Sequence, residues 1–184
     1  MTGKANHQML LALGKQLLVA LGEDPTRPAL ADTPKRWANM WREFIEYNPG
    51  NTDTVFEMRH TTDQMVVVSG MRVWSMCEHH LLPFWCDVSV GYIPADVVLG
   101  LSKFGRIAEQ HAHMLQTQER LVEQICADVI RKAGTCDVAV IARGEHLCMT
   151  MRGVKKPAIM TSSAMHGAFY NKPEARQEFL SLVR

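Results

Sequence analysis

The sequence has no apolar run near the ~20 residues that a membrane-spanning helix requires, so a membrane partner is not expected. It also lacks an excess of one charge, because 20 Lys and Arg balance 19 Asp and Glu to a formal net charge of +1. Nucleic acids usually select a clustered positive surface, so nucleic acid is not expected either. The 184 residues are 47% hydrophobic, which is typical of one globular domain with a real core.

A secretory signal is not expected, although residues 9–21 are apolar. Gly14, Lys15 and Gln16 interrupt that segment, and no small-residue cleavage site follows it. Leucine recurs there every three or four residues, which predicts an amphipathic helix. The five cysteines are odd in number, so we expect a reduced, cytoplasmic chain whose thiols are available to a metal.

The order of the expected elements predicts an α+β fold. Helices at 9–21 and from Thr33 to about Tyr47 make residues 1–50 an N-terminal helical region. Strands are expected at 54–60, 65–74, 84–93, 137–143, 146–152 and 158–163, a turn at 61–63, and helices at 102–114, at 118–132 and from Pro173. Hairpin-like neighbours favour an antiparallel sheet with helices on one face, so residues 51–184 are expected to form a single structural unit.

Two short segments carry the residue types of a metal site. They are Cys77-Glu78-His79-His80 and His146-Leu147-Cys148. On the strand expected at 146–152, residues two apart share a face, so His146 and Cys148 would lie side by side. Four converging groups would form a closed structural Cys2His2 site, whereas three ligands would leave a fourth position open for catalysis.

A surplus histidine favours the catalytic alternative. His79 adjoins His80, so an ionisable imidazole lies near the metal whichever residues bind it, and sites that move protons need such a group. Mixed thiolate and imidazole ligation favours Zn²⁺ over a redox metal. Zinc lowers the pKa of a bound water towards ~7, which indicates hydrolysis or hydration.

Longer motifs resemble the GTP cyclohydrolase I family from about residue 7 to 184. The matching stretches, in order, are Thr33-Pro34-Lys35-Arg36, Cys77-Glu78-His79-His80-Leu81-Leu82-Pro83-Phe84, Gly91-Tyr92-Ile93-Pro94, Gly100-Leu101-Ser102-Lys103, Arg106, Gln116-Thr117-Gln118-Glu119-Arg120-Leu121, His146-Leu147-Cys148-Met149, Arg152-Gly153-Val154 and Glu178-Phe179-Leu180. The resemblance implies a tunnelling fold (T-fold), an antiparallel sheet with two helices on one side. It also implies a homo-oligomer, a decamer of two stacked pentamers with active sites between subunits.

The resemblance implies an enzyme that opens the imidazole ring of GTP, releases C8 as formate and forms 7,8-dihydroneopterin triphosphate. That product could feed folate, another pterin or a modified deazaguanine. In this family pattern Cys77, His80 and Cys148 hold the zinc, and His79 and His146 transfer protons. C8 is a poor electrophile until N7 is protonated, so His146 is the candidate proton donor.

The remaining motif residues suit the rest of the nucleotide. Guanine presents two adjacent donors that a carboxylate accepts as a fork, so Glu119 is expected to bind the base, with Gln118 as a further substrate contact. The triphosphate is expected to contact a set of cations and one hydroxyl: Lys103, Arg106, Arg152, Arg36 from a neighbouring subunit, and Ser102. Without the resemblance, each of these charges would be interpreted as a solvated surface group.

The chain departs from the family pattern at three places. Trp85-Cys86-Asp87 follows Phe84 where glycine and lysine are usual, His113-Met114 replaces an arginine pair, and Asn39 replaces a lysine. Because positive charge is lost and GTP is highly anionic, we expect a higher KM for GTP than is typical, or a preference for a related purine nucleotide.

Two alternatives to a GTP cyclohydrolase follow from the same residues. One is a hydrolase of the same fold that acts on a related purine nucleotide. The other is a non-catalytic assembly protein that keeps a structural zinc. The presence of His79, His146 and Glu119 argues against the second alternative, because a scaffold needs none of them.

Overall fold

The computed structural model describes residues 4–57 and 64–183, so the turn expected at 61–63 and the end of the strand expected at 54–60 lie outside the described residues. The chain divides into two compact units, Met1–Asn48 and Pro49–Arg184. Among the described residues, no helix combines the length and the apolar character needed to cross a membrane.

The first unit is a pair of packed helices, as the sequence predicts. Helix α1 spans His7–Ala20 and helix α2 spans Thr33–Ile45. The Asn6 side chain caps α1 by accepting a hydrogen bond from the Met9 N–H at 3.0 Å. Gly14 is buried where the helices meet, and a Cβ there would lie 3.1 Å from the Cα of Pro34, so glycine permits the close approach.

The second unit is built on a five-stranded sheet with the order β5-β2-β3-β6-β7. These strands span Leu115–Gln116, Val66–Cys77, Pro83–Tyr92, Val138–His146 and Met160–Met165 respectively. All neighbours are antiparallel except β5, which pairs in parallel with the end of β2. A separate two-stranded sheet joins β1 (Val55–Glu57) to β4 (Val97–Leu99). The α+β class and the antiparallel pairing are as predicted, but β4 and β5 were not expected.

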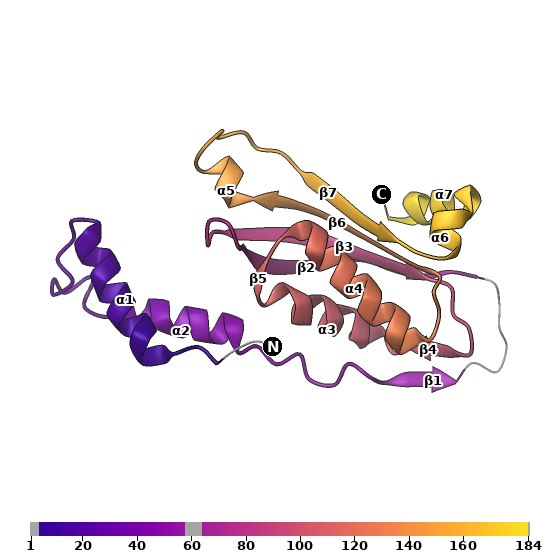
Figure 1. The fold of residues 1–184 in the computed structure, drawn as a ribbon, viewed down its shortest axis with the longest axis horizontal. Helices are drawn as coiled ribbons and strands as arrows, with labels where there is room; N and C mark the ends of the chain where they lie inside the picture. Colours follow the sequence, from indigo (N-terminus) through magenta and orange to yellow (C-terminus); the bar gives the residue numbers. More distant parts are fainter. Residues whose placement is uncertain (1–3, 58–63, 184) are drawn as a thin grey trace. The chain divides into compact units, whose positions relative to one another are not determined.

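Two helices cover one face of this sheet (Figure 1). They are α3 (Leu101–Ala112) and α4 (Gln118–Ala133). Every second residue of β3 faces them, from Phe84 through Cys86 to Val88, and these side chains form the main core with both helices. Helix α4 ends at Gly134, which adopts a left-handed conformation (φ 66°) that favours glycine at this position.

The expectation that helices cover only one face is wrong. Helices α6 (Ala168–Asn171) and α7 (Pro173–Leu182) pack on the opposite face, where Phe169 and Phe179 join Ala139 and Ile141 of β6 in a second core cluster. The reason lies in β6 itself, because residues 138–142 are apolar at every position and a strand of that kind is covered on both faces.

The prediction of a strand at residues 146–152 is also wrong. Strand β6 continues to His146, and the chain then forms the single helical turn α5 (Leu147–Thr150). Pairing between β6 and β7 ends at Gly144, so residues beyond it have no strand neighbour on that side in the described structure. The Thr150 hydroxyl instead donates to the His146 carbonyl at 3.2 Å, which holds the turn against the strand end.

Candidate metal and catalytic site

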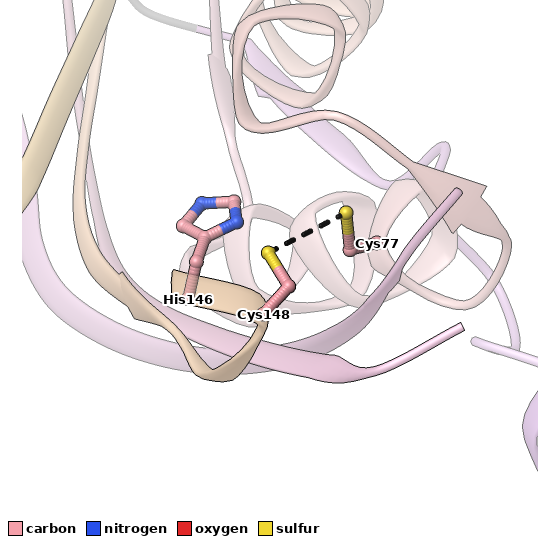
Figure 2. Close-up of side chains that lie close together, drawn as sticks. All are labelled: Cys77, His146 and Cys148. Atoms are coloured by element: carbon pink, nitrogen blue, oxygen red, sulfur yellow. Dashed lines mark hydrogen bonds between the residues drawn. The ribbon is translucent and has the colours of Figure 1, made fainter. Parts of the chain in front are cut away.

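The cysteines of the two motifs meet at one end of the sheet. Cys77 ends β2 and Cys148 lies in α5, and their Sγ atoms are 3.9 Å apart (Figure 2). Strand β3 causes this meeting, because its first residues pair with the end of β2 on one side and with His146 of β6 on the other. The sheet register therefore joins two motifs that are distant in the sequence.

His146 is the imidazole that lies near both sulfurs. One of its ring nitrogens and the two Sγ atoms all lie within 4.8 Å of one another. The ring stacks on Phe84, with centroids 4.4 Å apart and planes 4° apart. Burial lowers the pKa of His146, and the negative charge of Glu119 acts in the opposite direction.

His79 and His80 approach the site from the turn after β2. The Nδ1 atom of each ring lies 3.9 Å from the Cys77 Sγ, and both side chains are exposed. Leu81 adopts a positive φ of 54°, which closes the turn so that its N–H donates to the Cys77 carbonyl at 2.9 Å. The structure thus brings all five predicted metal and catalytic residues together, but only His146 groups with both sulfurs.

The thiol pair fits zinc. Two thiolates bound to one tetrahedral Zn²⁺ at about 2.3 Å each lie about 3.8 Å apart, close to the 3.9 Å between Cys77 and Cys148. Burial and the neighbouring Cys77 thiol raise the pKa of Cys148, whereas the charge of Arg152 lowers it. A divalent cation would offset the repulsion between two thiolates, so the donor set suits a metal that favours sulfur and nitrogen.

Gln118 lies inside the molecule, not on its surface. It is fully buried, and its Nε2 donates to the carbonyls of Ala142 in β6 (2.9 Å) and Met160 in β7 (3.1 Å). Its Oε1 lies 3.1 Å from the Nε2 of His146. All of these contacts are made within the chain, whereas the sequence predicted a contact with the substrate.

An open groove follows the start of α4 along β7. Glu119, Arg120 and residues 160–163 line it, and its volume of about 650 Å³ falls in the range of roughly 300–1,000 Å³ typical of small-molecule sites. Glu119 is exposed there and acts electrostatically on His146, so the carboxylate expected to bind the base lies near the candidate proton donor. Arg152 is exposed and acts on Cys148 in the same way.

Three of the four cations expected to bind phosphate have intramolecular partners. Lys103 is buried, and its ammonium donates to the Asn51 carbonyl at 2.9 Å. Arg106 donates from Nη1 to the Pro49 carbonyl at 3.2 Å. Ser102 is exposed beside them in the first turn of α3, and Arg36 pairs with Asp32 at 3.4 Å within the N-terminal unit.

Sequence reasoning missed an ion pair that holds the Cys77–His80 turn. Arg120 of α4 pairs with Glu78 at 2.5 Å, and its guanidinium also donates to the side chain of Gln116 at 2.6 Å. The Glu78 N–H donates to the Gln116 carbonyl at 3.1 Å. Glu78 and Arg120 both lie inside motifs of the resemblance, and this was the only indication in the sequence that they have a structural role.

Comparison with known proteins gives one consistent result. The family model of GTP cyclohydrolase I matches residues 12–184. A GTP cyclohydrolase 1 from a Sulfurihydrogenibium species is 44% identical over 90% of this chain and 89% of its own, and one from Dehalococcoides mccartyi is 44% identical over 92% and 93%. The Drosophila melanogaster GTP cyclohydrolase 1 is 45% identical over 91% of this chain and 53% of its own. A solved structure of an archaeosine synthase QueF-like protein is 17% identical and covers 54% of this chain and 92% of its own. Its TM-score of 0.42 is too low to assign a fold to this chain.

Proposed function

The chain belongs to the GTP cyclohydrolase I family, and on that premise we propose that it opens the imidazole ring of GTP, releases C8 as formate and forms 7,8-dihydroneopterin triphosphate. The observation that carries the proposal is the pairing of Cys77 and Cys148 beside the half-buried His146, with Glu119 near enough to act on that ring. A thiol pair, a histidine and a base-reading carboxylate are the groups that this reaction requires.

The proposed metal is zinc, held by Cys77, Cys148 and one histidine. The family resemblance favours His80, whose Nδ1 is 3.9 Å from the Cys77 sulfur, whereas proximity to both sulfurs favours His146. We propose His80 as the ligand, because this leaves the half-buried His146 for proton transfer. Zinc, when bound, supplies a water nucleophile at neutral pH by lowering the pKa of that water.

The chain's own residues would perform the remaining steps. Glu119 would accept the two adjacent donors of guanine and so orient the base at the groove beside α4. His146 would give a proton to N7 of the base, which makes C8 electrophilic, and the lowered pKa of His146 makes its protonated form a ready donor. His79, exposed on the turn, would move protons in the later ring-opening and sugar-rearrangement steps.

The sheet edges support the proposed T-fold ring. Strand β7 is terminal in the five-stranded sheet, and β5 pairs only with the last two residues of β2. In the described structure, residues 66–75 of β2 therefore have one strand neighbour. Pairing of β7 with β2 of the next subunit would satisfy both edges and close a ring, and the groove beside β7 would then lie between subunits. Two stacked pentamers are the proposed assembly.

The cytoplasm is the proposed location. Thiolate ligands need a reducing compartment, and all five cysteines are free thiols in the structure. The product is proposed to feed the synthesis of tetrahydrofolate, which belongs to one-carbon metabolism, of another pterin or of a modified deazaguanine.

The decisive experiment mixes zinc-loaded protein with GTP and measures formate and the fluorescence of oxidised neopterin. Stoichiometric formate and neopterin support the proposal, and the His146→Ala variant serves as the inactive control. Formate released from another purine nucleotide in preference to GTP would support the related hydrolase. If a zinc-loaded, ring-shaped protein releases no formate from any purine nucleotide, the chain is a non-catalytic assembly protein and the proposed activity is wrong.

A further inference from the structure

The orientation of the Gln118 amide is fixed by the backbone of two strands. The carbonyls of Ala142 and Met160 can only accept hydrogen bonds, so the end of the amide that faces them must be the NH2 group. The side chain is fully buried, so water cannot replace these partners. The opposite end of the amide, which faces His146, is therefore the carbonyl oxygen.

This orientation determines where His146 carries its proton. An amide oxygen only accepts, so the Nε2 atom 3.1 Å away must donate an N–H to it. A neutral imidazole has a single N–H, which leaves a lone pair on Nδ1. In Figure 2 one ring nitrogen of His146 lies on the side of the two sulfurs and the other points away from them. Since Nε2 contacts Gln118, the nitrogen on the sulfur side is Nδ1.

We propose that Gln118 is a positioning residue that holds His146 in the Nε2–H tautomer and so makes Nδ1 the atom that exchanges a proton in the site. Phe84 fixes the plane of the ring by stacking on it, and Gln118 fixes the rotation of the ring within that plane. The catalytic part of this inference rests on the proposed function, whereas the tautomer does not depend on it.

The role differs from a contact with the substrate. Each polar atom of the Gln118 side chain already has a partner inside the chain, and none of its surface is exposed. Partners that orient an active histidine from behind typically change metal affinity or activity by about 10–100-fold when they are removed. Removal of the Gln118 amide would therefore lower the rate of the reaction and leave the affinity for the nucleotide unchanged.

The tautomer is measured directly by ¹⁵N NMR on histidine-labelled, metal-free protein above the titration range of imidazole. The His146 signals are assigned by their loss in His146→Ala. The proposal expects a pure Nε2–H pattern in the wild-type chain and a mixture of tautomers in Gln118→Met. Gln116→Met is the matched control, since Gln116 is an equally buried glutamine whose side-chain amide donates to His111 and Gln124 and which has no hydrogen bond to His146 in the described structure. A wild-type ring protonated on Nδ1 overturns the proposal.

A second measurement tests the consequence for catalysis. Zinc-loaded Gln118→Met is expected to keep its KM for GTP and to lose about 10–100-fold in kcat. An unchanged kcat, or a raised KM with an unchanged kcat, overturns the positioning role, and the second result would mean that the side chain binds the nucleotide. If the wild-type protein does not act on GTP, the proposed function fails while the tautomer result stands. If Gln118→Met does not fold, the wild-type spectrum still decides the proposal.

Discussion

The sulfurs of Cys77 and Cys148 lie 3.9 Å apart although 71 positions separate the two residues in the sequence. Their closeness follows from β3, which pairs with β2 and β6 and so brings the ends of both strands together. A separation this close to the thiolate spacing in tetrahedral zinc sites makes loss of either sulfur a test of the metal.

We predict that Cys148→Ser loses zinc and cyclohydrolase activity together, because a hydroxyl is a much poorer zinc ligand than a thiolate. Metal analysis of the purified protein, paired with the formate assay, measures both. Cys136→Ser is the matched control, since Cys136 is exposed and lies outside the site. A Cys148→Ser protein that retains stoichiometric zinc would remove this cysteine from the ligand set.

The histidine ligand is decided by a pair of variants. With His80 as the third ligand, His80→Ala is expected to lose zinc, and His146→Ala is expected to keep zinc but lose ring opening. The two variants separate the alternatives, because His146 lies near both sulfurs whereas His80 contacts the Cys77 sulfur. If His146→Ala loses zinc and His80→Ala keeps it, His146 is the zinc ligand and His80 is not.

Local pattern predicted most of the fold. Short runs of apolar and β-branched residues, alternating in some strands and continuous in β6, predicted β2, β3, β6 and β7 within a few positions, because each strand packs at least one face against the core. Strand β5 has only two residues, and its pairing with Met76 and Cys77 creates it, so no local signal existed. The turn α5 was missed because the His-x-Cys spacing was interpreted as a strand, although β7 no longer accompanies β6 beyond Gly144.

The site was predictable to the level of residue types and no further. The candidate cysteines and histidines could be recognised from their chemistry and spacing. The buried position of Gln118 between β6 and β7 depends on how α4 packs on the sheet, and its sequence neighbours are consistent with an exposed residue as well. The pairing of Glu78 with Arg120 joins elements 42 positions apart, so only the folded chain reveals it.

Asp128 links α3 to α4 and is expected to make stability depend on acid pH. Its carboxylate accepts from His111 at 2.8 Å and pairs with Arg131, and these contacts lower its pKa from 3.8 to about 2 despite burial. A depressed pKa in the folded state contributes stability above the unfolded value, and that stability disappears as the pH falls from about 4 towards about 2.

We therefore predict that Asp128→Asn loses roughly 2 kcal/mol of unfolding free energy near neutral pH. The difference from the wild type should shrink as the pH falls through that window. Denaturant unfolding at fixed protein and zinc concentration measures it, with the exposed Glu178→Gln as the control. A difference that stays constant down to acid pH would show that the carboxylate charge is not its source.

The charges near the expected phosphate site differ in their surroundings. Asp87 belongs to one of the expected departures from the family pattern, but Arg72 pairs with it through two hydrogen bonds of 2.6 and 2.7 Å and lies over the Trp85 ring at 3.9 Å. Its charge is thus compensated locally, and alternation along β3 places it on the face away from α3 and α4. Lys103 lies on α3, where its ammonium contacts the Asn51 carbonyl.

We expect a KM for GTP above that typical of the family, and a KM that rises less steeply with salt, because fewer cations are expected to meet the phosphates. Asp87→Asn should leave KM unchanged, whereas Lys103→Met should raise it by about tenfold, as for the loss of one charge-assisted contact. Steady-state kinetics at several ionic strengths measure all three proteins, and thermal unfolding shows whether Lys103→Met remains folded. A folded Lys103→Met protein with wild-type KM would mean that Lys103 serves only to hold Asn51, and a marked fall in KM for Asp87→Asn would place Asp87 within reach of the phosphates.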